Sequence, residues 1–200
     1  GDDYLESIAA WYQKAGYQFL VFTDHNVLAD TEHWVTVERT KGGQKAFDAL
    51  KQQFPDWVEE RTQEGMVQVR LRRFDEVAPR FNRPGEFLLI QGEEVSDSFQ
   101  KHPLHMNVSN VKELLVPRGG TSVRNVIQNN VDAAIAQRER TRRPMMIHLN
   151  HPNFGWGITA EDLAPIRGEN FFEVYNGHPG VNNPGDEQHV STERMWDVIN

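Results

Sequence analysis

The chain has 200 residues, 38% of them hydrophobic and 25% charged, which is the size and composition of one globular domain with a buried core. Its formal net charge of -8 argues against a broad nucleic-acid-binding face, because such faces are normally basic. The sequence contains no cysteine, so any bound metal must be held by His, Asp or Glu. No apolar run reaches the roughly 20 residues that cross a membrane. We therefore expect a soluble protein, whose compartment, cytoplasmic or exported, is left open.

Helical and strand-like patterns alternate along the chain. Apolar residues spaced i, i+3, i+4 and i+7 predict a helix through 5–12, and a second apolar stripe predicts a helix between Thr121 and Pro144. Short, continuously apolar runs predict buried strands at 17–22, 87–90, 104–108, 145–149 and 171–175. Residues 41–83 are less regular. The alternation predicts a parallel α/β fold in a single domain, residues 1–200.

Polar residues follow four of these strands at the point where each strand ends. They are Thr23-Asp24-His25-Asn26, Gly92-Glu93-Glu94, His151-Pro152-Asn153 and Asn176-Gly177-His178. In parallel α/β folds, ligand-binding groups gather where the carboxyl ends of the strands open. Histidine and glutamate without cysteine form a ligand set for Zn²⁺, Mn²⁺ or Fe²⁺, and a carboxylate can bridge two such ions. The pattern therefore predicts a metal centre, although each motif alone is also compatible with a polar turn.

The order of the motifs resembles a known family. The segments "GYQFLVFTDHN", "GEEVS", "HPLHMNVSN", "HLNHPN" and "EVYNGH" are similar to the central motifs of the PHP (polymerase and histidinol phosphatase) metallohydrolases, and most of all to their carbaryl-hydrolase-like subgroup. The resemblance spans nearly the whole chain. It implies an α/β fold of the family's kind, a distorted (β/α)7 TIM-like barrel, which holds two or three divalent metals, Zn, Mn or Fe.

The resemblance also implies roles for individual residues. It makes His25 a ligand of one metal and Glu94 the carboxylate that bridges the other two. His105 and His151 would complete the second metal of that pair. Glu94 and His25 are thus the residues that we expect at the reacting centre.

Two expected motifs are absent from the chain. Family members begin with His-x-His and end with Asp-x-His, whereas the eight histidines here include no pair two positions apart. Gly1 falls in the helix expected after the first motif, and Asn200 in the helix expected before the last. We therefore expect a central fragment of a longer protein, lacking the first and last barrel strands and inactive on its own. A family member that truly lacks those ligands is the alternative.

Further polar residues lie next to the expected ligands in the sequence. We expect Asp24, Glu93 and His148 to orient the ligands without binding metal, although Glu93 also fits a solvated carboxylate and His148 a packed histidine. Asn176 and His178 are candidates for substrate contact, and a plain Asn-Gly turn explains them equally well.

The predicted function is metal-dependent hydrolysis of a phosphoester, a small phosphomonoester in the first place, by a metal-activated hydroxide. Hydrolysis of a carbamate, amide or carboxylic ester on the same metals is one alternative, and a noncatalytic, metal-poor PHP scaffold or binding module is another. The sequence lacks a G-x-S-x-G elbow and a phosphate-binding P-loop, so nothing supports a serine nucleophile or an NTPase. The expected partner is a small-molecule substrate, with no membrane span, and the oligomeric state is left open.

Overall fold

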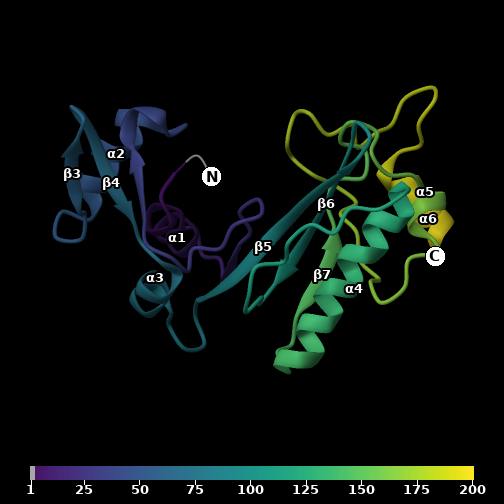
Figure 1. Ribbon diagram of the computed structural model, residues 1–200, viewed down its shortest axis with the longest axis horizontal. Coiled ribbons are helices and arrows are strands. Elements are labelled where there is room, and N and C mark those ends of the chain that lie inside the picture. Colours follow the sequence, from purple (N-terminus) through teal and green to yellow (C-terminus); the bar gives the residue numbers. More distant parts are fainter. Residues whose placement is uncertain (1–2) are drawn as a thin grey trace. The chain divides into compact units, whose positions relative to one another are not determined.

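The computed structural model describes residues 3–200, so the first two residues of the predicted domain lie outside the described residues. The chain forms two compact units (Figure 1). The first unit runs from the N-terminal region to Phe22 and continues over Leu28–Gln91. The second unit consists of Thr23–Val27 and Gly92–Asn200.

The first unit combines four helical segments with a small antiparallel sheet. Its helices are α1 (Leu5–Lys14), η1 (Val37–Arg39), α2 (Gly43–Gln53) and α3 (Phe74–Phe81). Its sheet has the strand order β2 (His33–Thr36), β4 (Met66–Leu71), β3 (Glu60–Gln63). Glu64 and Gly65 join β3 to β4 and both have positive φ, 53° and 76°. This is the conformation that a two-residue hairpin turn of type I′ requires.

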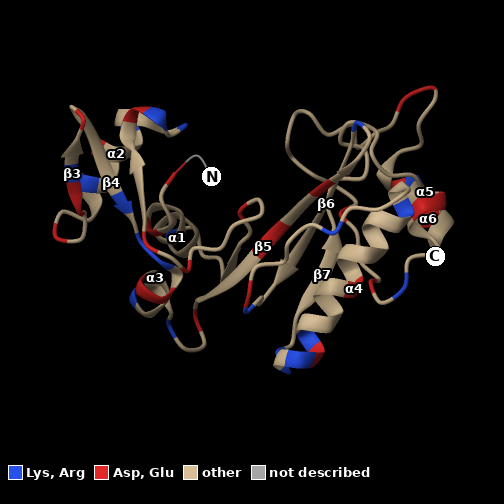
Figure 2. Ribbon diagram, viewed as in Figure 1, with Lys and Arg blue, Asp and Glu red and all other residues tan. Residues whose placement is uncertain are grey.

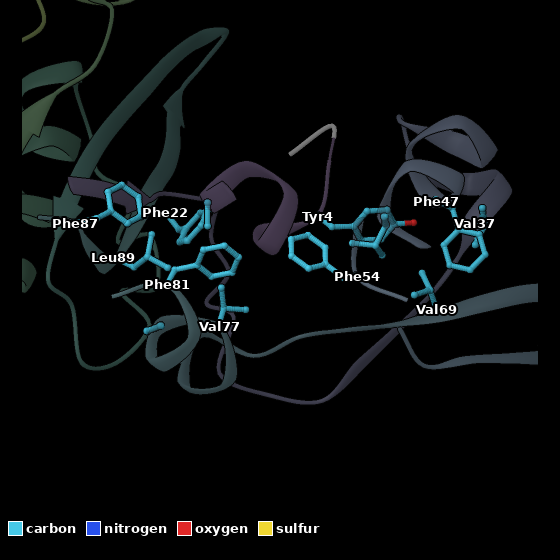
Figure 3. Close-up of a cluster of buried hydrophobic side chains, with 13 residues drawn as sticks. Tyr4, Phe22, Val37, Phe47, Phe54, Val69, Val77, Phe81, Phe87 and Leu89 are labelled. Atoms are coloured by element: carbon cyan, nitrogen blue, oxygen red, sulfur yellow. The ribbon is translucent and has the colours of Figure 1, made fainter. Parts of the chain in front are cut away.

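The core of the first unit is apolar, and six of the thirteen buried residues in its cluster are aromatic (Figure 3). Phe47 and Leu50 lie three positions apart on α2, on one face of the helix, and both are almost fully buried. Val69 on β4 belongs to the same cluster. Burying each such side chain stabilises the fold by roughly 1.5–3 kcal/mol. The irregular segment of the sequence, 41–83, thus supplies much of this core.

Strand β5 (Leu88–Phe99) is shared by the two units. In the first unit it pairs in parallel with β1 (Phe19–Phe22), from Phe19 opposite Leu88 to Phe22 opposite Gln91. From Gly92 onward it pairs antiparallel with β6 (His102–Ser109), and β6 pairs antiparallel with β7 (Met146–Leu149).

The second unit is completed by helices. They are α4 (Val123–Thr141), α5 (Ala160–Leu163) and α6 (Thr192–Ile199). The Ser122 hydroxyl accepts a hydrogen bond from the Asn125 N–H and caps α4. Helix α4 packs against β6. Along β6, burial alternates: Leu104, Met106 and Val108 are buried, whereas His105 and Asn107 on the other face are only partly covered.

The predicted (β/α)7 TIM-like barrel is wrong. Within residues 3–200 the strands form one sheet in the order β1-β5-β6-β7 and one in the order β2-β4-β3, and neither closes into a barrel. The parallel series also fails, because β5 and β6 are joined by only two residues, Gln100 and Lys101. A connection that short allows an antiparallel hairpin, whereas parallel pairing requires a crossover of roughly a dozen residues or more.

The last predicted strand, 171–175, is not a regular strand either. Only Phe172 in this segment pairs, in an isolated parallel bridge with Leu149. In the part of the chain that the structure describes, no helix combines the length and apolar character that a membrane crossing requires.

Candidate metal centre

Glu94 lies at the centre of a cluster of three histidines in the second unit. Its Oε1 atom is 3.1 Å from His105 Nδ1 and 3.4 Å from His151 Nε2. Its Oε2 atom is 3.7 Å from His25 Nδ1. The two oxygens of one carboxylate thus face different histidines.

Backbone pairing brings these four residues together. His25 forms an isolated parallel bridge with Glu94, in which Asn26 N–H donates to the Glu94 carbonyl (3.0 Å) and Glu94 N–H donates to the Asp24 carbonyl (3.1 Å). His105 enters from β6, opposite Ser96 of β5. His151 follows β7 by two residues, and the intervening Asn150 donates its N–H to the His105 carbonyl (3.0 Å). The structure therefore brings the four residues together, but not at the ends of parallel strands, because Glu94 and His105 lie within β5 and β6 and the pairing of β5, β6 and β7 is antiparallel.

The cluster fits a cation. Two ligand atoms that each lie about 2.1 Å from one tetrahedral ion are roughly 3.4 Å apart, which is the range of the distances above. The His105 Nδ1 atom is buried and makes no hydrogen bond. A neutral imidazole nitrogen and a carboxylate oxygen repel at 3.1 Å unless a proton or a cation lies between them. Among the described residues, ligand atoms of His25, Glu94 and His105 all lie within 4.8 Å of one another. His151 is not a member of this group and adjoins it through Glu94 Oε1, 3.4 Å from its Nε2 atom.

Neighbouring side chains stabilise the negative charge of the Glu94 carboxylate. Burial raises the pKa of the Glu94 carboxyl, but the nearby side chains of His105, His151 and Asn150 outweigh burial and leave the pKa well below its ordinary value. The carboxylate is therefore ionised across the physiological range, as a metal ligand must be.

The cluster has a covered side and an open side. The side chains of Glu94, His105 and His151 are only 14%, 15% and 14% exposed, whereas His25 is 64% exposed. The cluster is therefore open to solvent at His25 and largely covered at the other three residues.

Ser96 and Asn26, to which the sequence assigned no individual role, support His25. The Ser96 hydroxyl lies 2.6 Å from His25 Nδ1. Asn26 donates to the Ser96 carbonyl and accepts from the Ser96 N–H, both at 2.8 Å, from a left-handed backbone (φ 52°) that asparagine tolerates. Only the position of Asn26, directly after His25, could have indicated this role.

Glu93, which we expected beside the ligands, lies on the other face of β5. Its side chain is fully buried, and its Oε2 atom accepts the Leu115 N–H at 2.8 Å. Burial raises the pKa of Glu93 to about 7, an effect that the Leu115 N–H only partly offsets. Figure 2 shows the acidic positions along β5. Glu93 is neither solvated nor directed at the histidines.

His148 lies on the same face of the sheet as Glu94. Glu94 pairs with Asn107 and Asn107 with His148, so the three form a row across the strands. The Asn107 amide nitrogen is 3.4 Å from His148 Nε2. Burial lowers the pKa of His148, and the negative charges of Glu173 and Glu94 oppose that shift. An orienting role for His148, and for Asp24, stays a prediction.

Asn176 and His178 belong to a loop that is bonded to itself. The Asn176 side chain donates to Glu173 Oε2 (2.9 Å) and accepts the His178 N–H (2.8 Å), and His178 Nδ1 accepts the Gly180 N–H (3.0 Å). The Phe154 ring lies 5.1 Å from the His151 ring and 6.1 Å from the His178 ring. The Asn176 amide is thus used within the protein, while His178 lies one ring away from the cluster.

No protein-family model matches the chain, and no curated protein matches its sequence. The resemblance to the PHP family therefore rests on the order of the motifs and stays a prediction, as does the ligand role of each residue.

Proposed function

We propose that the second unit binds two divalent cations through Glu94 and uses them to hydrolyse an ester, a small phosphomonoester in the first place. The observation that carries this proposal is the division of the Glu94 carboxylate. One oxygen faces His105 and His151, and the other faces His25. A carboxylate that presents its two oxygens to separate nitrogen ligands is arranged to bridge two ions.

The residues of the cluster would hold the two cations on different sides of Glu94. His105, His151 and Glu94 Oε1 would hold one cation on the covered side, and His25 with Glu94 Oε2 would hold the other on the open side. This places His25 on a cation shared with Glu94, and not on the separate third metal that the resemblance implies. The Ser96 hydroxyl, 2.6 Å from His25 Nδ1, hydrogen-bonds that nitrogen and orients the exposed ring, so His25 would bind the cation through its other ring nitrogen, Nε2. Divalent cations at such a site supply Lewis acidity that makes water a nucleophile near neutral pH. The low exposure of the three inner residues strengthens the electrostatic interactions there.

The donor set and the motif order support the proposal. Imidazole nitrogen with carboxylate oxygen suits Zn²⁺, Mn²⁺ or Fe²⁺. The order of the motifs agrees with hydrolases of the PHP family, although the chain does not form the barrel expected of them.

Metal content tests the binding step. We expect the chain, purified without chelator and dialysed, to contain about two equivalents of Zn, Mn or Fe. The Glu94 carboxylate would be shared by two ions, and the histidines would supply the other protein ligands. His105→Ala and His151→Ala should each lower that number. His33→Ala, an exposed histidine on β2, is the matched control and should leave it unchanged. Equal stoichiometry in all four proteins would contradict the assignment.

Hydrolysis tests the chemistry. A metal-loaded protein that contains this chain together with the two absent motifs is assayed with p-nitrophenyl phosphate, p-nitrophenyl acetate and an aryl N-methylcarbamate. We expect it to cleave the phosphate and residues 1–200 alone to be inactive. Cleavage of the acetate or the carbamate alone would replace the phosphoester proposal with one of the alternatives. Bound metal without any hydrolysis would favour a noncatalytic binding module.

A further inference from the structure

His151 has an unusual backbone for a residue with a side chain. Its φ is 27°, on the left-handed side that favours glycine. Such a conformation costs roughly 1–3 kcal/mol unless its surroundings hold it. His151 is also the residue whose Nε2 faces Glu94 Oε1. A strained backbone therefore coincides with a candidate metal ligand.

One carboxylate holds this backbone. The His151 N–H donates to Glu173 Oε2 at 2.8 Å. Hydrogen bonds to an ionised acceptor are roughly twice as strong as neutral ones. The neighbouring Asn150 N–H donates to the His105 carbonyl. The backbone N–H groups of two successive residues, Asn150 and His151, are thus both held by hydrogen bonds.

Glu173 is itself fixed by two kinds of contact. Its N–H donates to the Leu149 carbonyl at 2.8 Å, which ties it to the end of β7. Its Oε2 atom accepts a second hydrogen bond from the Asn176 amide at 2.9 Å. Asn176 is bonded in both directions to Asn183, at 3.0 and 2.8 Å. A continuous hydrogen-bond chain thus runs from Asn183 to His151.

We propose that Glu173 is a positioning residue of the metal centre, which holds His151 in its left-handed conformation and so directs Nε2 at Glu94. This inference rests on the proposed function, because it gives Glu173 a purpose only if His151 binds metal. Ligands must be held within about 0.5 Å of their working geometry. Relaxation of the His151 backbone would move the ring, which lies several bonds away, by more than that tolerance.

Glu173 does not act as a ligand in this proposal. Its Oε2 atom already accepts two N–H groups, from His151 and Asn176. The sequence does not indicate this role. The segment "FFEVY" has the pattern of a buried strand, and a single glutamate in such a strand predicts only a side chain that faces outward.

Metal affinity and a ligand-field spectrum test the proposal. Zn²⁺ affinity is measured by competition with a chromophoric chelator, and the visible spectrum is recorded after Co²⁺ substitution. We expect Glu173→Ala to weaken binding of the more tightly held Zn²⁺ ion by about 10–100-fold and to alter the visible absorption bands of bound Co²⁺. Glu173→Gln keeps an acceptor oxygen for the His151 N–H, so its Zn²⁺ affinity and Co²⁺ spectrum should be close to those of the wild type.

Glu169→Ala is the matched control. Glu169 lies four residues earlier and also accepts a backbone N–H, from Phe171, but it contacts none of the four clustered residues in the described contacts. This variant should match wild type in affinity and spectrum. A Glu173→Ala protein with wild-type affinity and bands would overturn the proposal, as would a Glu169→Ala protein with the same losses. If Glu173→Ala does not fold, Glu173→Asp, whose carboxylate is one methylene short, takes its place.

Amide exchange separates this inference from the proposed function. In the metal-free chain, loss of the Glu173 bond should speed exchange of the His151 amide by up to about tenfold, near the upper end of what one net hydrogen bond contributes. Wild-type protein that binds no metal would remove the proposed function and, with it, any role for Glu173 in a metal centre. Unchanged His151 exchange in the variant would overturn the positioning role even if metal binds.

Discussion

Glu93 and Glu94 show how one residue type takes two environments on a single strand. Successive side chains of a strand point to opposite faces. Glu94 meets three histidines and keeps its charge, whereas Glu93 is fully buried against the Leu115 N–H with a pKa raised to about 7. The sequence places two acids side by side, and only the register of β5 against β6 decides which one faces the cluster.

This difference predicts unequal effects of two matched substitutions. Glu94→Gln keeps the volume and removes the charge, so the loaded protein should lose at least about 100–1000-fold in kcat/KM, or roughly 3–4 kcal/mol of transition-state stabilisation. Glu93→Gln should lose far less. Steady-state kinetics on the substrate that the wild type cleaves give both values. An inactive Glu93→Gln with an active Glu94→Gln would reverse the assignment, and two fully active variants would remove the catalytic proposal.

Between elements of the first unit, a network of ion pairs joins β4 to α3. Arg70 on β4 and Arg72, just after the strand, are buried, and both contact Glu76 on α3 and Glu59 before β3. Arg70 reaches Glu76 Oε1 at 2.7 Å and Glu59 Oε2 at 2.9 Å. The hydrogen bonds from Arg70, and then those from the Arg73 N–H and Arg72, lower the pKa of Glu76 to about 2. Charged positions of β4 and α3 are marked in Figure 2.

The Glu76 pKa predicts how stability depends on pH. Because the folded pKa of about 2 lies below the ordinary 4.5, ionised Glu76 stabilises the fold above pH 4.5, and this contribution is lost as the pH falls toward 2. Glu76→Gln should lower the free energy of unfolding at pH 7 by about 2–4 kcal/mol, because buried arginines lose a charged partner. The difference in the free energy of unfolding between the variant and the wild type should become smaller from pH 6 to pH 3.

Urea unfolding followed by tryptophan fluorescence measures this difference, since Trp57 lies against Arg72 and Arg80. Glu113→Gln is the control, because the Glu113–Arg140 pair is exposed and should barely affect stability. A difference for Glu76→Gln that stays constant between pH 6 and pH 3 would argue against the depressed pKa.

Local patterns predict elements better than they predict pairing. The spacing of apolar residues correctly indicates α1 and α4, and the apolar runs indicate β1, β5, β6 and β7. Their directions depend on connections that periodicity does not show. The two residues between β5 and β6 allow only a hairpin. The run 171–175 forms a single bridge, between Phe172 and Leu149, and Leu149 is the last residue of β7.

At the scale of the whole molecule, the sequence predicts the gathering of the four candidate ligands but not the architecture around them. His25, Glu94, His105 and His151 converge because each lies in or just after a strand of one sheet. The supporting contacts come from Ser96, Asn107, Asn150 and Glu173, residues whose roles arise from cross-strand neighbours distant in sequence. The division into two units likewise has no marker, because the boundary falls inside the continuous strand β5.

The division into units predicts where metal binding should be felt. All four clustered residues belong to the second unit, and a ligand stabilises the states that bind it, by about 2.7 kcal/mol at 100 times its dissociation constant. Saturating Zn²⁺ should therefore slow hydrogen exchange of amides in β6 and β7 by up to about 100-fold, while amides of the β2-β4-β3 sheet keep their metal-free rates.

Mass spectrometry of peptides from both units measures this difference, with His105→Ala expected to abolish the slowing and His33→Ala to preserve it. Equal slowing in both sheets would show that the two units open together. An absence of slowing in β6 and β7, in a protein shown to contain metal, would place the metal outside the cluster around Glu94.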